Sequence, residues 1–214
     1  MDERVVEQAV TALRAGQPVV VPMDTVYGLC AYPYRPEPAE RLYKLKGRTE
    51  TQPTALVAID LQMLFECVPE LRGRANEARA LLPGPFTLIF PNPARRYRWL
   101  TGDRPETIGV RVPELSGPGR AVLNALGAVA ATSANLPGKP DPRRLDEVPD
   151  EIREACGALV DGGELPGRPS TVIDLTGAEP SVVREGAVPA QESLDRLAAV
   201  NHGGTPGSPM SPLL

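Results

Sequence analysis

The sequence predicts an α/β fold: a twisted, open, mixed sheet with helices on both faces. Apolar runs of strand length alternate with segments whose apolar residues recur at helical spacing, which is typical of this class. The last three predicted strands follow one another without an intervening helix, which indicates an antiparallel portion of the sheet. The 25 prolines and 20 glycines fall mostly between the apolar runs and therefore mark turns.

The first predicted element is a helix over residues 3–15. Val6, Val10 and Leu13 recur there at the spacing of one helix face. Gly16 follows the last of them and is a stop signal. The pattern predicts an amphipathic helix at the surface of the domain.

The next two elements are a strand and a helix. Val19–Val21 form a continuous apolar run between prolines, as in a strand buried on both faces. Residues 36–45 predict a helix with proline in its first turn. The remaining predicted elements are strands at 54–59, 86–90, 107–112, 128–132, 158–160, 171–175 and 181–185, helices at 119–126, 150–156 and 190–199, a broken helix at 60–82 and a loop at 91–106.

The bulk composition is that of one soluble globular domain. The chain has 214 residues, of which 42% are hydrophobic and 23% are charged. We expect residues 1–200 to form a single domain and residues 201–214, rich in glycine and proline, to form a disordered tail. Neither a signal segment nor an apolar run long enough to span a bilayer is present. We therefore expect a cytoplasmic protein with no membrane partner.

Several kinds of chemistry are excluded by the residue inventory. The net charge of −4 argues against a chain dominated by nucleic-acid binding, although it permits local basic patches. The single histidine, His202, falls in the predicted tail, which argues against a nucleophile activated by histidine. The three cysteines are far apart and form no metal-binding pair motif. No phosphate-binding or dinucleotide-binding glycine motif is present, so any nucleotide must be held by scattered side chains.

Two segments near the N-terminus have the composition of the floor and rim of a binding site. Pro22–Leu29, PMDTVYGL, follows the first apolar strand with small and hydroxyl-bearing residues, among them Thr25. Lys46 and Arg48 flank Gly47 directly after a predicted helix. Lysine supplies a compact positive charge, and arginine supplies a planar fork for two phosphate oxygens. The plainer interpretation is a helix C-terminus whose cations interact favourably with the helix dipole.

Three further segments place polar side chains at strands. Arg111 lies inside an apolar run and needs either a structural carboxylate or an anionic ligand. Ser133 and Asn135, two residues apart, either project to one side of an extended segment or form a turn that satisfies its own backbone. Ser170 begins a strand and Arg184 lies in the next; the alternative there is an edge hairpin with a surface arginine.

The order and spacing of these segments resemble one known family. The chain carries, in order, PMDTVYGL, KGR, PGPFT, GVRVP, SAN, STVID and VREG, which together span nearly all of the predicted domain. The corresponding motifs of the YrdC-like threonylcarbamoyl-AMP synthases are a PTDTVYGL strand end followed by K-x-R, P-G-P-x-T, V-R-x-P, S-x-N, S-T-x-x-D and R-x-G. Longer members carry an extra C-terminal domain, and we expect this chain to be the single-domain form.

The resemblance implies a YrdC-like fold with a large concave cavity, and it implies an activity. Members condense L-threonine, bicarbonate and ATP to threonylcarbamoyl-AMP and pyrophosphate, with Mg²⁺ accompanying ATP. The product serves the threonylcarbamoyladenosine modification of tRNA. A contact with RNA and a transient contact with the tRNA threonylcarbamoyl-transferase complex are further partners that the resemblance implies.

By matching motifs, the resemblance also assigns roles to residues of this chain. The residues that would contact ATP are Lys46, Arg48, Ser133, Asn135 and Arg184. The residues on the threonine and carbamate side would be Thr25, Arg111 and Ser170. No protein nucleophile or protein metal ligand is assigned, because the carbamate carboxylate attacks the α-phosphorus itself. The reaction therefore requires positioning and the neutralisation of phosphate charge.

Two positions depart from the family pattern. Met23 stands where the family usually has a threonine near the threonine pocket, and it keeps open a paralogue that uses another carbamoyl acceptor or hydrolyses a nucleotide. In Gln52-Pro53-Thr54, the family more often has a basic residue or asparagine before the proline and leucine after it, which bears on the phosphate-side loop.

A binding module without catalysis is the alternative from a different functional class. Arg95, Arg96 and Arg98 lie beside Tyr97 and Trp99, a combination suited to phosphate contacts and base stacking. Such a module would bind double-stranded RNA or a nucleotide. The plainer interpretation of this segment is a mobile surface loop.

Overall fold

The computed structural model describes residues 3–47 and 51–202 of the chain. Arg48 of the predicted cation pair lies outside the described residues, as does the predicted tail beyond residue 202. No helix within the described ranges has the length and apolar composition needed to cross a bilayer.

Within the described residues, nine strands form one mixed sheet in the order β7-β1-β2-β6-β3-β5-β4-β8-β9. The strands are β1 (Val19–Pro22), β2 (Tyr27–Ala31), β3 (Ala55–Ala58), β4 (Phe86–Pro91), β5 (Thr107–Arg111), β6 (Ala128–Ser133), β7 (Ala158–Leu159), β8 (Thr171–Asp174) and β9 (Ser181–Arg184). The predicted antiparallel portion is confirmed for β8 and β9, but it is wrong for β7, which pairs in parallel with β1 at the opposite edge of the sheet. Antiparallel pairing extends further than expected, because β1–β2, β2–β6, β3–β6 and β4–β5 are antiparallel as well.

One strand was absent from the sequence prediction. β1 ends at Pro22, and a tight turn, in which Met23 N donates to Val26 O at 3.3 Å, leads into the antiparallel β2. The PMDTVYGL segment therefore contains the end of one strand, a turn and the start of the next. No glycine or proline separates Val26 from the following apolar residues, so the usual punctuation of a hairpin is missing from the sequence.

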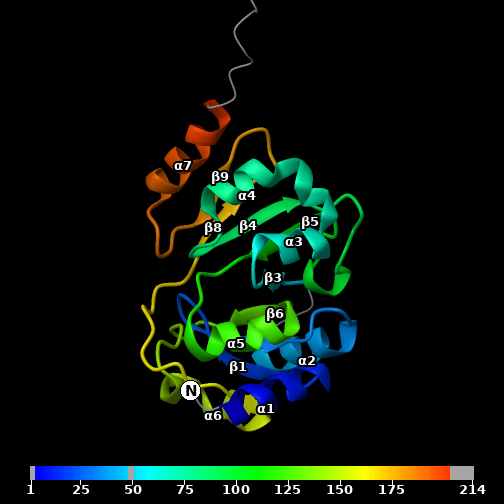
Figure 1. Cartoon of the computed structure of the whole chain (residues 1–214), viewed down its shortest axis with the longest axis vertical. Helices are drawn as coiled ribbons and strands as arrows, with labels where there is room; N and C mark the ends of the chain where they lie inside the picture. The colour runs from blue at the N-terminus through cyan, green and yellow to red at the C-terminus, as the bar shows by residue number, and fades with distance from the viewer. Residues whose placement is uncertain (1–2, 48–50, 203–214) are drawn as a thin grey trace, which may run out of the picture.

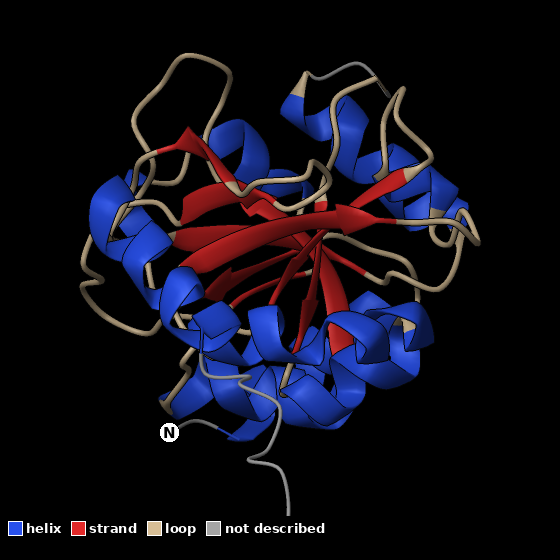
Figure 2. Ribbon diagram, turned by 90° about the horizontal axis from the view of Figure 1, so that it is seen from above, coloured by secondary structure: helices blue, strands red, loops and turns tan. Residues whose placement is uncertain are grey.

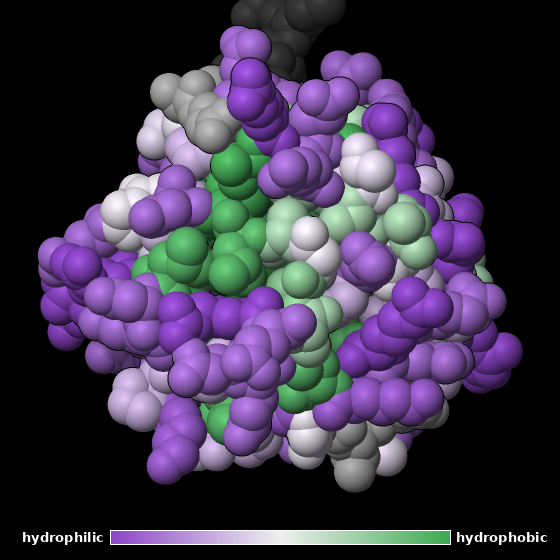
Figure 3. Space-filling model, turned by 90° about the horizontal axis from the view of Figure 1, so that it is seen from below, coloured by the Kyte–Doolittle hydropathy of each residue, from purple (hydrophilic) through white to green (hydrophobic). Residues whose placement is uncertain are grey.

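Two helices cover one face of the sheet. α1 (Glu3–Arg14) and α5 (Gly117–Leu126) pack on each other and on β1, and their apolar residues share a core with Val19, Val21 and Val129. Figure 1 shows α1 at the lower end of the molecule and α7 at the opposite end. Seen from below, hydrophobic side chains form a hollowed patch within a largely hydrophilic surface (Figure 3).

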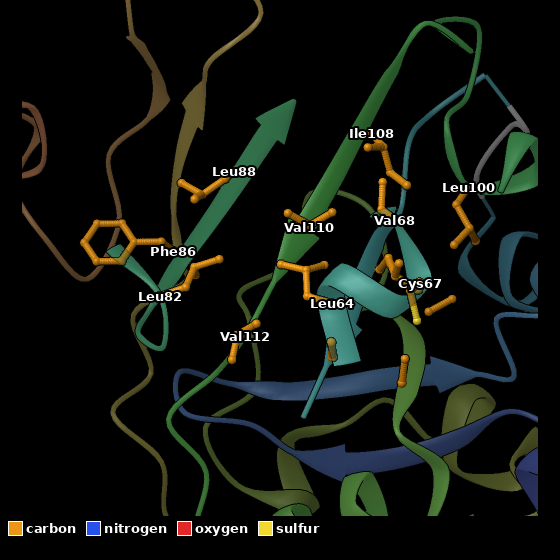
Figure 4. Close-up of a cluster of buried hydrophobic side chains, with 14 of the residues drawn as sticks. Leu64, Cys67, Val68, Leu82, Phe86, Leu88, Leu100, Ile108, Val110 and Val112 are labelled. Atoms are coloured by element: carbon orange, nitrogen blue, oxygen red, sulfur yellow. The ribbon is translucent and has the colours of Figure 1, made fainter. Parts of the chain in front are cut away.

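The remaining helices supply the core of the opposite face. They are α2 (Pro36–Lys46), α3 (Leu61–Cys67), α4 (Ala75–Leu81), α6 (Asp150–Ala155) and α7 (Ala190–His202), with short 3₁₀ segments η1 (Pro69–Arg74), η2 (Arg98–Leu100) and η3 (Leu145–Glu147). Buried side chains from α3, β4 and β5, such as Leu64, Leu88 and Val110, meet there (Figure 4). Figure 2 shows helices on both sides of the twisted sheet.

The prediction of helices on both faces is confirmed, but α1 and α5 cover only part of their face. In β4 and β8, fully buried residues alternate with half-buried ones. The buried residues belong to the core of the opposite face, and half-buried residues such as Thr87, Ile89 and Val172 line a cavity. The open half of this face therefore provides the concave surface that the resemblance implies.

The last helix differs from its prediction. α7 runs to His202 instead of ending at residue 199, so the backbone of the single histidine belongs to a helix and not to a tail. Leu197 of α7 is buried in the main core, and α7 packs on α4. Packing of α7 on α4 is a tertiary contact, which the local sequence around residues 200–202 does not indicate.

Candidate active site

A cavity of about 260 Å³ lies on the open half of the sheet. Its floor includes small residues from four neighbouring strands, namely Gly28 of β2, Ala131 of β6, Ala55 of β3 and Gly109 of β5. Small side chains let a ligand approach the sheet closely. Charged and hydroxyl side chains surround this floor, so the cavity combines an apolar base with a polar rim.

Met23 lies at one end of this floor, and the position of its side chain requires the glycine beside it. A Cβ atom at Gly28 would lie 3.2 Å from Met23 Cγ and 3.3 Å from its Cε. Only glycine at position 28 therefore leaves full room for Met23 in its observed position. Met23 is buried and lines the cavity, which confirms that the departure from the family pattern falls within the site.

An ion pair joins the β1–β2 turn to the end of β5. Arg111 Nη2 donates to Asp24 Oδ1 at 2.8 Å and to Thr25 Oγ1 at 3.4 Å. The other oxygen of Asp24 accepts a hydrogen bond from Glu114 N at 3.3 Å. Arg111 is thus held by a structural carboxylate, one of the two alternatives that its sequence position left open. Its Nε is buried without a hydrogen-bond partner within the described part of the chain, and Arg111 also lines the cavity.

Burial dominates the titration of this pair. It raises the pKa of Asp24 above its ordinary value, although the positive charge of Arg111 acts in the opposite direction. It lowers the pKa of Arg111, again against the favourable charge of its partner. The attraction within the pair therefore only partly offsets the desolvation of the two groups. We infer that the pair orients Arg111 more than it stabilises the fold.

A second polar chain runs across β9, β8 and β4. Arg184 Nη2 donates to Ser170 O at 2.9 Å and to Ser170 Oγ at 3.3 Å. Ser170 Oγ is also 2.8 Å from Thr87 Oγ1. All three residues line the cavity. β8 and β9 do form an antiparallel hairpin at the sheet edge with an exposed arginine, as the plainer alternative expected, but Arg184 also reaches back to Ser170 and lines the cavity.

Lys46 and the Ser133–Asn135 segment form a third group. Lys46 is buried, and its Nζ donates to Ser133 O at 2.6 Å and to Asn135 Oδ1 at 2.6 Å; it also donates to Asn135 O. Ser133 Oγ donates to the same Asn135 Oδ1 at 2.7 Å. Lys46 is the last residue of α2, as the helix-terminal interpretation expected, but that interpretation is incomplete because the side chain is buried and hydrogen-bonded to the end of β6. Its charge is inside the protein, at the end of β6.

The structure brings five of the eight predicted site residues to the cavity wall. They are Thr25, Arg111, Ser133, Ser170 and Arg184. Lys46 and Asn135 do not line the cavity, but their hydrogen bonds tie them to Ser133. Arg48 lies outside the described residues. The ligand contacts assigned to these residues remain predictions, although their convergence on one cavity supports them.

Sequence reasoning missed several polar residues of the site, and three of them contribute charge or hydrogen bonds that bear on its geometry. Asp24 lies within the PMDTVYGL motif, but only the fold shows that it is the partner of Arg111. Thr87 ends the PGPFT motif, which in isolation indicates only a turn into a strand. Arg104 lines the cavity from the loop before β5, and no motif marked it.

The basic and aromatic segment around residue 97 is separate from this cavity. None of Arg95, Arg96, Tyr97, Arg98 and Trp99 is among the described residues that line it. Arg96 Nε pairs with Glu70 at 2.9 Å, and Trp99 Nε1 donates to Pro33 O at 2.9 Å. The three arginines are exposed, as expected for a surface loop, and these two contacts tie the segment to Glu70 and Pro33.

The fold and cavity permit comparison with known proteins. A family model described as "Telomere recombination", of the Sua5/YciO/YrdC proteins, matches residues 11–186. This chain belongs to the Sua5/YciO/YrdC family. The model spans every predicted site residue, including the two arginines on β5 and β9.

Two members of the Sua5/YciO/YrdC family are similar to the chain over most of its length. The Pyrococcus abyssi threonylcarbamoyl-AMP synthase is 32% identical over 182 residues, which are 84% of this chain and 53% of that protein. The chain therefore spans about half the length of this relative. The Escherichia coli protein YciO is 33% identical over 192 residues, covering 86% of this chain and 90% of YciO.

Solved structures of the same two proteins confirm the fold. The crystal structure of P. abyssi Sua5 complexed with L-threonine has a TM-score of 0.80 at 31% identity and covers 92% of this chain and 58% of that one. The crystal structure of E. coli YciO has a TM-score of 0.75 at 30% identity and covers 90% of this chain and 94% of that one. The YrdC-like fold is therefore shown.

Proposed function

We propose that this protein is an L-threonylcarbamoyladenylate synthase that condenses L-threonine, bicarbonate and ATP and releases pyrophosphate. The observation that carries this proposal is the convergence of Thr25, Arg111, Ser133, Ser170 and Arg184 on one cavity. Relatives named threonylcarbamoyl-AMP synthase, and a relative crystallised with L-threonine, support it. The product would serve the threonylcarbamoyladenosine modification of tRNA.

The chemistry of the cavity suits a reaction without a protein nucleophile. In the proposed step, a carbamate oxygen forms a bond to the α-phosphorus of ATP, the bond from that phosphorus to the bridging oxygen breaks, and pyrophosphate leaves. The protein would bind and orient the two substrates and neutralise their negative charge. Arg184, Arg111 and the buried Lys46 would supply that positive charge. The thiols of Cys30 and Cys156 are poor nucleophiles, because burial raises the pKa of both, that of Cys156 to about 12.

Mg²⁺ would accompany ATP as part of the substrate. No group of three or more acidic, histidine or cysteine side chains suited to a metal occurs among the described residues. A Mg²⁺ ion bound to a nucleotide requires only one or two carboxylates besides the phosphate oxygens. Asp141 is a carboxylate on the cavity wall, so the residues present fit an ion that is held mainly by the triphosphate.

The decisive experiment combines the wild-type chain with ATP, Mg²⁺, L-threonine and bicarbonate. We expect pyrophosphate release that needs both threonine and bicarbonate, and an acyl-adenylate detected by mass spectrometry. Arg184→Gln should reduce turnover at least tenfold, since it removes a charged contact at the exposed rim without opening the core. Arg72→Gln is the matched control, because Arg72 is an exposed arginine of η1 outside the cavity.

Two results would contradict the proposal. The first is that the wild-type chain releases no pyrophosphate in a threonine-dependent manner when ATP, Mg²⁺, L-threonine and bicarbonate are all present. The second is an equal effect of Arg184→Gln and Arg72→Gln on turnover, which would show that the activity does not depend on this cavity. Steeply salt-dependent RNA binding without adenylate formation would instead favour the binding module.

Met23 supports a second candidate, a paralogue that uses another carbamoyl acceptor. Its thioether lies on the cavity floor where the family usually has a threonine hydroxyl, and the chain is about as similar to YciO as to the synthases. Calorimetric titration of a panel of amino acids in the presence of a non-hydrolysable ATP analogue separates the two candidates. Tighter binding of threonine than of valine favours the synthase, and the reverse order favours the paralogue.

A further inference from the structure

The chain of side chains from Arg184 through Ser170 to Thr87 has a defined hydrogen-bond direction. Arg184 can only donate, so Ser170 Oγ accepts from it at 3.3 Å. Ser170 and Thr87, 2.8 Å apart, share one further hydrogen bond that uses the proton of one of the two hydroxyls. The two hydroxyl groups have one proton each, and their shared hydrogen bond uses only one of these protons. The other O–H is therefore free to donate to a ligand. The cavity is the place where this donor can be used, because both hydroxyl residues line it.

Burial indicates which hydroxyl carries the free proton. Ser170 is only 4% exposed and its hydroxyl lies between the other two groups, whereas Thr87 is half-buried in β4. The arrangement in which Ser170 donates to Thr87, and Thr87 donates into the cavity, leaves the free donor on the more accessible side chain. A positive charge at the far end of the chain makes that donor stronger, because successive hydrogen bonds polarise one another.

The rotamer of Thr87 is fixed by its neighbours in the sheet. Its methyl carbon Cγ2 lies 3.9 Å from the position that a Cβ would take at Gly109 of β5, so the methyl group is on the β5 side. Its hydroxyl is on the opposite side, toward Ser170 at the start of β8. A β-branched side chain has few alternative rotamers, and the hydrogen bond to Ser170 favours the one that points the hydroxyl toward β8.

We propose that Thr87 is a positioning residue of the site, which presents a single O–H donor to an anionic carboxylate oxygen of the carbamate. This inference rests on the proposed synthase function and adds to it. Ser170 was assigned to the carbamate side and Arg184 to the nucleotide side, and the two are in direct contact. Their contact therefore marks the place where the two substrates meet, and Thr87 lies beside it.

The test is steady-state kinetics of Thr87→Val and Thr87→Ser. Valine has the shape of threonine without the hydroxyl, so we expect KM for bicarbonate to rise about tenfold to a hundredfold, as for a lost hydrogen bond to a charged group. KM for ATP should change less than twofold. Thr87→Ser restores the hydroxyl, and it should recover most of the wild-type KM for bicarbonate.

The matched control is Thr176→Val. The hydroxyl of Thr176 donates to Asp174 Oδ1 at 2.6 Å in the turn after β8, and Thr176 is not among the described residues that line the cavity. Its removal should leave all kinetic constants unchanged. The free energy of unfolding of each variant, measured in urea, shows whether a kinetic change reflects lost folding.

Four outcomes would overturn the inference. A rise in KM for ATP without a rise in KM for bicarbonate would show that the Thr87 hydroxyl donates to the nucleotide. Equal impairment of Thr87→Val and Thr87→Ser would show that packing matters and the hydroxyl does not. An unchanged KM for bicarbonate in Thr87→Val, with an active wild-type enzyme, would overturn this inference and leave the synthase function intact. An inactive wild type would overturn both.

Discussion

At the scale of single residues, the Asp24–Arg111 pair shows how a buried carboxylate fixes the position of a buried arginine. The side chains of Arg111 and Asp24 are 12% and 7% exposed, so both are largely removed from water. Replacing such a pair as a whole costs little, but removing one partner leaves the other charge buried and unpaired. The pair therefore fixes the position of Arg111 at a cost in desolvation that the fold as a whole must offset.

Asp24→Asn tests this view, because it keeps the shape and one acceptor oxygen but removes the charge. We expect the free energy of unfolding in urea to fall by about 3–5 kcal/mol. Glu70→Gln is the control, since it removes the partner of Arg96 in an exposed pair, and it should cost less than about 1 kcal/mol. Equal small losses in both variants would show that Arg111 does not depend on Asp24.

At the scale of elements, one close contact joins the start of α5 to the end of β1. A Cβ at Gly119 would lie 2.2 Å from Pro22 O, which is a backbone atom and cannot rotate away. Pro22 directly precedes the turn that carries Asp24 and Thr25. The absence of a side chain at Gly119 therefore lets α5 pack against the strand that positions this side of the cavity.

Gly119→Ala should destabilise the protein, although alanine is the better helix former. We expect a loss of about 1–3 kcal/mol from overpacking, measured as a lower urea midpoint. Gly73→Ala is the matched control, because a Cβ there would meet nothing within 4 Å and the glycine has no left-handed backbone. That variant should be neutral or stabilised by up to about 1 kcal/mol. A stabilised Gly119→Ala would disprove the close contact.

At the scale of the whole molecule, one core runs through the length of the sheet. Its buried residues come from β1 and β2 at one end and from Ile173 of β8 and Leu197 of α7 at the other. The cavity occupies the opposite face, where none of the described helices fills the space over β4 and β8. The continuous core therefore supports the strands from one side and leaves the cavity side open.

Hydrogen exchange should reveal this arrangement as a gradient of protection across the sheet. We expect the amides of 128–133 and 55–58 in the central strands to exchange most slowly, because both strands are buried and paired on two sides. The amides of 181–184 should exchange fastest among the strands, because β9 is an exposed edge strand with an irregular register. Slow exchange in 181–184 would indicate a partner on that edge.

Much of the element order could be predicted from the sequence. Hydrophobic period and punctuation by glycine and proline depend on neighbouring residues, so the helix at α1 and the strands at β4 and β6 follow from the chain itself. The missed β2 shows the limit of such signals. Its turn at residues 23–26 has no glycine or proline, and pairing with β1 and β6 defines the strand.

The sequence by itself determined the family, the α/β class and five of the polar residues that line the cavity, because each of these follows from local spacing and residue type. Only the tertiary structure decided what those residues do to one another. It buried Lys46 against Ser133 and Asn135, paired Arg111 with Asp24, and joined Arg184 to Thr87 through Ser170. These contacts join residues far apart in the chain, and charge and hydrogen-bond energies depend on distance and burial, which no local pattern contains.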